Sequence, residues 1–84
     1  MIRTFADIKT FLIAQNLGRE YAPGAFMSED VSIGDAGNGD IVVYVNSADK
    51  RRREAIHSLI EKEYSDVSNV EIVSCGPAIA NAAA

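Results

Sequence analysis

An apolar strand followed directly by a basic helix start constrains this chain more than any other feature. Ile41–Asn46 reads IVVYVN, and such a run of consecutive apolar residues is typical of a strand that has apolar side chains on both faces. Ser47–Arg53 follows and contains four consecutive cations, Lys50–Arg53, at the start of a helix that Asn46 or Ser47 is expected to cap. The helix has an apolar seam at three- and four-residue spacing, formed by Ala55, Ile56, Leu59, Ile60 and Tyr64.

A second helix is predicted near the N-terminus. Thr4 can cap it, and Asp7 lies in its first turn, where an acidic side chain is favourable. Apolar residues at helical spacing then predict a helix over about Phe5–Leu17, with Gly18 as the residue after its end. Arg19–Asp30 follows as an expected connector with a Pro-Gly turn.

Three strands complete the expected order α-β-β-α-β. Val31–Ile33 alternates, Gly34–Asp40 is turn material that joins it to the central strand as a hairpin, and Val70–Val73 is the third strand. The fold class is therefore predicted as α+β: a two-layer sandwich with a three-stranded sheet and both helices packed on one face. The helix between the second and third strands should make a right-handed crossover.

Strand alternation then assigns an inner and an outer face of the sheet. The inner face collects Val31, Ile33, Ile41, Val43, Val45, Val70 and Ile72. Val42, Tyr44 and Val73 point outward, beside Ser32 and Glu71, although an outer face would ordinarily be polar. Either the connector or the C-terminal tail covers these apolar side chains, or another chain does. Val42, Tyr44 and Val73 are the candidate partner-binding residues.

The four cations offer a second candidate surface. Lys50, Arg51 and Arg53 could bind an anion with the help of the helix N-terminal N–H groups. The alternative is a solvated helix face, in which the aliphatic part of the Arg52 side chain packs over the edge of the core. His57 is expected to pair with Glu61, one turn later on the same helix.

Composition limits the classes of function. The chain has 84 residues, one cysteine, one histidine and a net charge of −4. One domain over residues 1–76 with an Ala-rich tail over residues 77–84 is predicted, without an internal disulfide or a zinc site. Cys75 is expected to be an inert, partly buried thiol. The acidic balance disfavours general nucleic-acid binding. With no export signal and no membrane-spanning run, the expected location is cytoplasmic.

The order of elements over residues 30–74 is similar to that of BON domains of bacterial envelopes. The likeness includes the charged helix start and the closing segment VSNVEIV, residues 67–73. Asn46 and Ser47 stand where that family usually has a glycine after its central strand. The resemblance concerns the order of elements and carries over no functional residue.

These observations favour a small interaction module that is not an enzyme and needs no cofactor or metal. It is expected to associate through the outer sheet face with another protein or with a second copy of itself. One alternative is an anion- or nucleic-acid-recognising module that uses the basic cluster. The other is a small acidic inhibitor of a larger cellular or viral complex.

Overall fold

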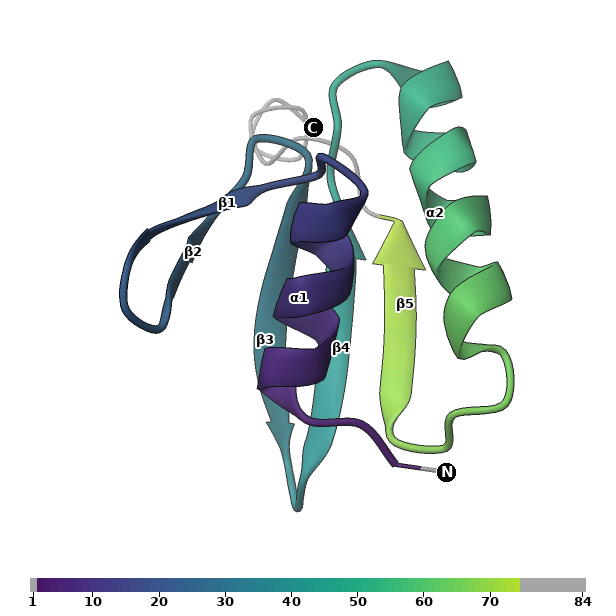
Figure 1. The fold of residues 1–84 in the computed structure, drawn as a ribbon. Coiled ribbons are helices and arrows are strands. Elements are labelled where there is room, and N and C mark those ends of the chain that lie inside the picture. Colours follow the sequence, from purple (N-terminus) through teal and green to yellow (C-terminus); the bar gives the residue numbers. More distant parts are fainter. Residues whose placement is uncertain (1, 75–84) are drawn as a thin grey trace.

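Residues 2–74 form two helices, a mixed three-stranded sheet and a separate two-stranded hairpin, which together make a small α+β fold (Figure 1). The structure is a computed structural model and describes residues 2–74; Cys75 and the predicted tail over residues 77–84 lie outside them. The elements are α1 (Phe5–Ala14), β1 (Arg19–Ala22), β2 (Ala25–Met27), β3 (Val31–Gly37), β4 (Asp40–Val45), α2 (Lys50–Tyr64) and β5 (Val70–Ser74).

The three-stranded sheet has the order β3-β4-β5, with β4 at its centre. β3 runs antiparallel to β4, so that Val31 pairs with Val45 and Ile33 with Val43. β5 runs parallel to β4 and pairs Ile72 with Val43. A parallel neighbour needs a crossover connection, and α2 supplies it.

The core lies between the inner face of this sheet and both helices. Val43 and Val45 on β4 are fully buried, as are Ile8 and Leu12 on α1 and Ile60 on α2. The helices also contact each other, because the rings of Phe11 and Tyr64 meet edge to face with their centroids 5.4 Å apart. The alternation that assigned Ile41, Val43 and Val45 inward and Val42 and Tyr44 outward is confirmed by the burial along β4.

The predicted connector is a β-hairpin. β1 and β2 pair in antiparallel fashion, with Pro23 and Gly24 at the turn and Gly24 in the left-handed region at φ 78°. The prediction of a connecting loop without strands was therefore wrong, although the turn itself was placed correctly. All four residues of β1 are exposed, so the strand lacks the alternation by which strands are recognised in a sequence.

The first helix begins as predicted and ends earlier. The Thr4 hydroxyl accepts the Asp7 N–H, and the Asp7 carboxylate accepts the Thr4 N–H, which completes a capping box. The helix stops at Ala14 because Asn16 adopts a left-handed φ of 59°. The end predicted at Leu17–Gly18 was thus wrong. Gly18 serves another purpose, since any side chain there would overlap the ring of Phe26.

The hairpin between β3 and β4 is tighter than predicted. β3 continues to Gly37, and the turn itself consists of Asn38 and Gly39, both with positive φ, at 56° and 83°. Two central residues with positive φ form a type I′ turn, whose twist matches that of the flanking strands. The pairing register shifts between Asp35 and Gly37, so the end of β3 is bulged.

Candidate functional site

The three outward apolar residues lie side by side on the sheet face opposite the helices. Tyr44 on β4 pairs with Val73 on β5 and with Ser32 on β3, while Val42 pairs with Glu71. Tyr44 is 39 % exposed, and Val42 and Val73 are half-buried. Val42, Tyr44 and Val73, called the outer-face cluster below, therefore form one patch across two neighbouring strands.

The ring of Tyr44 lies across a glycine on the next strand. A Cβ atom at Gly34 would come within 3.2 Å of Tyr44 Cε2, so the ring covers the α-carbon of Gly34. The phenol ring therefore lies over the main chain of Gly34, where a larger residue would crowd it. Within residues 2–74 both helices lie on the other face of the sheet, and no described helix or strand covers this patch (Figure 1).

The basic helix start is capped by its own carboxylate. Asp49 Oδ1 accepts the backbone N–H groups of Arg51 and Arg52, at 2.9 and 3.3 Å. Asp49 is the N-cap, and the prediction of Asn46 or Ser47 in that position was wrong. Two of the N–H donors on which an anion site would depend are therefore already engaged.

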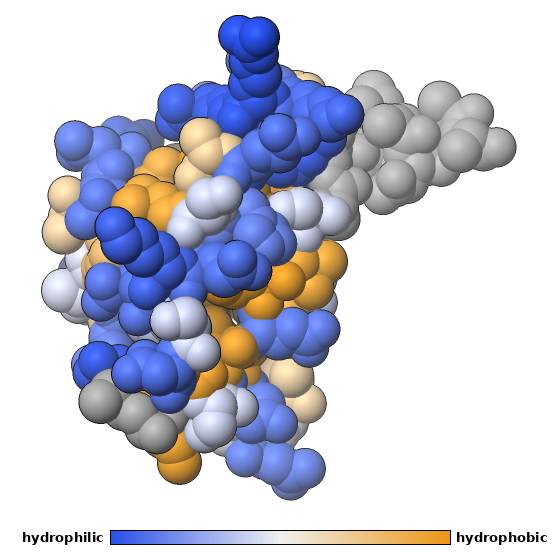
Figure 2. Space-filling view, turned by 90° about the vertical axis from the view of Figure 1, so that its right-hand side faces the viewer, coloured by the Kyte–Doolittle hydropathy of each residue, from blue (hydrophilic) through white to orange (hydrophobic). Residues whose placement is uncertain are grey.

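The predicted anion ligands are in different environments. Arg53 is half-buried, and its Nη1 donates to the carbonyl oxygen of Ser47 at 2.7 Å, which ties the guanidinium to the turn before the helix. Lys50 and Arg51 are exposed and take part in no ion pair within residues 2–74. Figure 2 shows that the surface over α2 is largely hydrophilic, with apolar atoms exposed in a band beside the helix.

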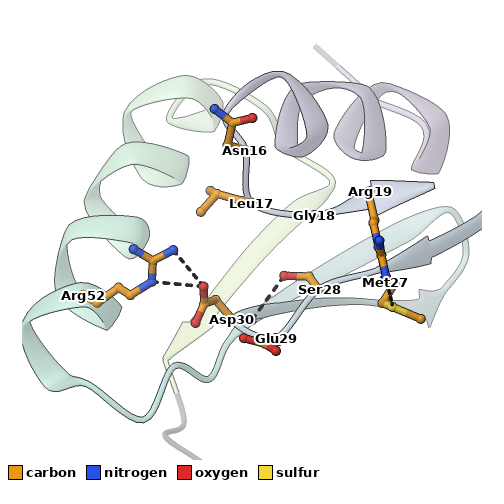
Figure 3. Close-up of a pocket in the computed structure, with 9 residues that line it drawn as sticks. All are labelled: Asn16, Leu17, Gly18, Arg19, Met27, Ser28, Glu29, Asp30 and Arg52. Carbon is orange, nitrogen blue, oxygen red and sulfur yellow. Dashed lines mark hydrogen bonds and ion pairs between the residues drawn. The ribbon is translucent and has the colours of Figure 1, made fainter. Parts of the chain in front are cut away.

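A polar hollow of about 400 Å³ lies between the end of α1, the base of the hairpin and the start of α2 (Figure 3). On one side Arg52 holds Asp30 through Nε and Nη2, at 3.0 and 2.9 Å, and this hydrogen-bonded ion pair raises the pKa of Arg52 above its ordinary value. On the other side Arg19 Nη2 lies 3.6 Å from Met27 Sδ. Arg52 and Asp30 thus neutralise each other, whereas Arg19 and Glu29 form no ion pair within residues 2–74. The residues that line it are Asn16, Leu17, Gly18, Arg19, Met27, Ser28, Glu29, Asp30 and Arg52.

His57 makes the contact predicted for it and one that the sequence did not indicate. Its Nε2 lies 3.4 Å from the Glu61 carboxylate, and its Nδ1 lies 2.5 Å from the Ser74 hydroxyl at the end of β5. A serine, a histidine and an acid in contact resemble the order of groups in hydrolytic triads. The contact between His57 and Ser74 joins α2 to the end of β5.

No family model, curated protein or solved structure matched the chain when it was compared with each of these. Neither helix of the described residues has the length and apolar content that a bilayer crossing needs. Within residues 2–74, no group of three or more His, Cys, Asp or Glu side chains is arranged to hold a metal ion.

Proposed function

We propose that this chain is a non-enzymatic protein-interaction module that associates, through its outer-face cluster, with another protein or with a second copy of itself. One observation carries the proposal: Val42, Tyr44 and Val73 form a contiguous apolar patch on the sheet face that faces away from both helices. Tyrosine is enriched among the residues that dominate binding energies, and a ring supported by Gly34 loses little freedom on binding.

The size of the face sets the expected strength of the association. Three strands about 4.8 Å apart and five residues at about 3.3 Å each give a flat face of about 240 Å². A stable complex of standard size uses about 800 Å² on each partner. The face therefore supports a weak, transient association, unless a partner also contacts neighbouring surface.

A pair of lysine substitutions tests the proposal. Tyr44→Lys places a charge in the outer-face cluster. Leu59→Lys is its matched control, because Leu59, which was wrongly predicted to belong to the buried seam of the helix, is 38 % exposed on α2. The oligomeric state of each variant is measured by light scattering after size exclusion and by native mass spectrometry over a range of concentrations. We expect Tyr44→Lys to abolish self-association and Leu59→Lys to preserve it. A parent chain that is strictly monomeric excludes the second-copy version.

Association with another protein needs a test in the cell. A photo-crosslinking amino acid replaces Val73 in one variant and Leu59 in the other. The proposal expects a discrete adduct from position 73 that Tyr44→Lys removes, and no such adduct from position 59. A chain that neither self-associates nor forms this adduct has no partner at the outer face, and the proposal is then rejected.

Anion recognition by the basic helix start is the second candidate. It is favoured by the exposure of Lys50 and Arg51 and weakened by the engagement of Asp49 with the helix N–H groups. Filter binding of a labelled RNA oligonucleotide to the parent chain and to a Lys50→Glu/Arg51→Glu variant tests it. Retention that is unchanged by the double charge reversal excludes this candidate.

A further inference from the structure

β3 is an edge strand, and its pairing with β4 shows which of its residues direct their main-chain N–H and C=O groups toward the free edge. The Asn46 N–H donates to the Asp30 carbonyl oxygen at 2.9 Å, which makes these two residues a hydrogen-bonded antiparallel pair. Hydrogen-bonded and non-hydrogen-bonded pairs alternate along such a ladder. Ser32 and Gly34 therefore point their main-chain groups toward β4, whereas Val31, Ile33 and Asp35 point theirs toward the free edge.

The Asp30 N–H is taken by Ser28 Oγ at 3.2 Å, so the Asp30–Asn46 pair at the end of the ladder has one of its two hydrogen bonds. The next residue follows the alternation. The Val31 N–H is taken by Ser28 Oγ at 3.2 Å rather than by β4. β4 is the strand with which β3 pairs, and no other strand of the described residues lies in its sheet beyond that edge. Ile33, two residues further along the strand, thus presents both its N–H and its C=O toward the free edge.

An apolar hollow of about 340 Å³ runs beside the same edge. Its lining includes Phe5 from the start of α1 and Met27 from β2, which are 43 % and 45 % exposed, and the half-buried Ile33 from β3. Phe26 is half-buried there and packs against the core. Apolar side chains of an incoming strand would cover these groups while its main chain pairs with β3. The full lining is Phe5, Phe26, Met27, Ser28, Val31, Ser32 and Ile33.

Carboxylates stand at both ends of this edge. Glu29 precedes β3, and Asp35 and Asp40 lie at its far end beside the turn. All three are exposed, and within the described residues none of them forms an ion pair. The charge of the edge therefore complements a segment that has basic residues at both of its ends.

We propose that the free edge of β3 binds an extended, basic-ended apolar segment of another protein, which adds to the sheet as a fourth strand. A second copy fits less well. Antiparallel pairing of two β3 strands about Ile33 would bring the Asp35 end of each copy against the Glu29 end of the other, and like charges would face each other. The proposal concerns the sheet edge and does not depend on the outer-face cluster.

Amide hydrogen exchange measured by NMR tests two points together: that the Ile33 and Asp35 N–H groups are free in the unbound chain, and that a peptide binds to them. The probe is the peptide acetyl-Arg-Lys-Val-Thr-Ile-Thr-Val-Lys-Arg-amide at about 1 mM, where affinities down to about that value are detected. In the free chain we expect fast exchange at the Ile33 and Asp35 amides and slow exchange at those of Ser32 and Gly34. The peptide should slow exchange at Ile33 and Asp35 by about tenfold if its dissociation constant is about 0.1 mM, and by about twofold if it is about 1 mM.

Two variants separate main-chain pairing from contact with the apolar side chain. Ile33→Pro removes the outward N–H at a position where an edge strand tolerates proline, and Ile33→Ala shortens the side chain while keeping the N–H. We expect Ile33→Pro to bind the peptide about tenfold more weakly than Ile33→Ala. If Ile33→Pro does not fold, peptides N-methylated at one or the other set of alternate residues replace it, and one set alone should lose binding.

Four results would overturn the proposal. The first is an Ile33 amide that is already protected in the free chain, which means that the tail or a second copy occupies the edge. The second is equal binding of the peptide with glutamates in place of its four basic residues. The third is protection centred on Tyr44 and Val73, or loss of peptide binding in Tyr44→Lys. The fourth is the absence of any peptide-dependent protection.

Discussion

Replacing Asn69 with alanine should destabilise the fold far more than its place in a turn suggests. Asn69 is 7 % exposed and precedes β5. Its Nδ2 donates to the Arg3 carbonyl at 2.7 Å and to the Gly39 carbonyl at 2.9 Å, and its Oδ1 accepts the Arg3 N–H at 2.9 Å. One side chain therefore ties the segment before α1, the β3–β4 turn and the start of β5 together.

The magnitude follows from these three bonds. Each contributes about 1 kcal/mol net, and alanine leaves three main-chain groups without their partner, so Asn69→Ala should lose about 2–3 kcal/mol. A domain of this length has a free energy of unfolding of about 4–13 kcal/mol. The loss is thus a substantial fraction of the total, and it should lower the melting temperature by about 10–20 °C.

Urea unfolding followed by far-UV circular dichroism measures this loss. Ser58→Ala is the control, because Ser58 is exposed on α2 and its substitution should change stability by less than about 0.5 kcal/mol. Asn69→Ala should also speed exchange at the Arg3 amide, which loses its acceptor. If Asn69→Ala costs no more than the control, the three bonds are replaced by water without loss and the reasoning is wrong.

The inward Val43 and the outward Val42 should differ on substitution: Val43→Ala should cost about 2–3 kcal/mol and Val42→Ala less than about 1 kcal/mol in urea unfolding. Hydrogen bonds from the Thr4 main chain and hydroxyl lower the pKa of Asp7, so its contribution is present above its unfolded-state pKa and lost as pH falls through the folded value. Asp7→Asn should therefore flatten the fall of the urea midpoint below about pH 4. Burial raises the pKa of Tyr64 to about 12, so the stability linked to it is full below about pH 10 and falls as pH rises further; Tyr64→Phe should remove that alkaline fall.

The features that the sequence predicted correctly depend on local periodicity. The alternation of β4 assigned its two faces because burial changes with every residue along a strand. The start of α1 was predicted because Thr4, which can cap a helix, and Asp7, an acidic residue of the first turn, are three residues apart. In both cases a few neighbouring residues carry all the information.

The features that were missed depend on contacts between distant residues. β1 is exposed along its whole length, and the hairpin packs through the Phe26 ring on Gly18, eight residues apart. Asp30 and Arg52 are 22 residues apart, and Ser74 lies 17 residues from His57. No periodic signal links such pairs. The outward direction of the outer-face cluster could be predicted, whereas the free edge of β3 and its hollow required the arrangement of α1, β2 and β3 in space.

The two proposed surfaces belong to one sheet, and this makes them energetically linked. A strand added at β3 would widen the outer face from about 240 to about 320 Å² and would lie next to Ser32, the neighbour of Tyr44 across the β3–β4 pair. A partner on the outer face would then contact the added strand as well, so each ligand should strengthen the binding of the other. Even four strands remain below the area of a standard interface, so the coupling should appear as a lower dissociation constant of a transient complex rather than as a permanent assembly. Without a partner on the outer face there is nothing to couple to, so Tyr44→Lys should leave the affinity of the β3 edge for its peptide unchanged.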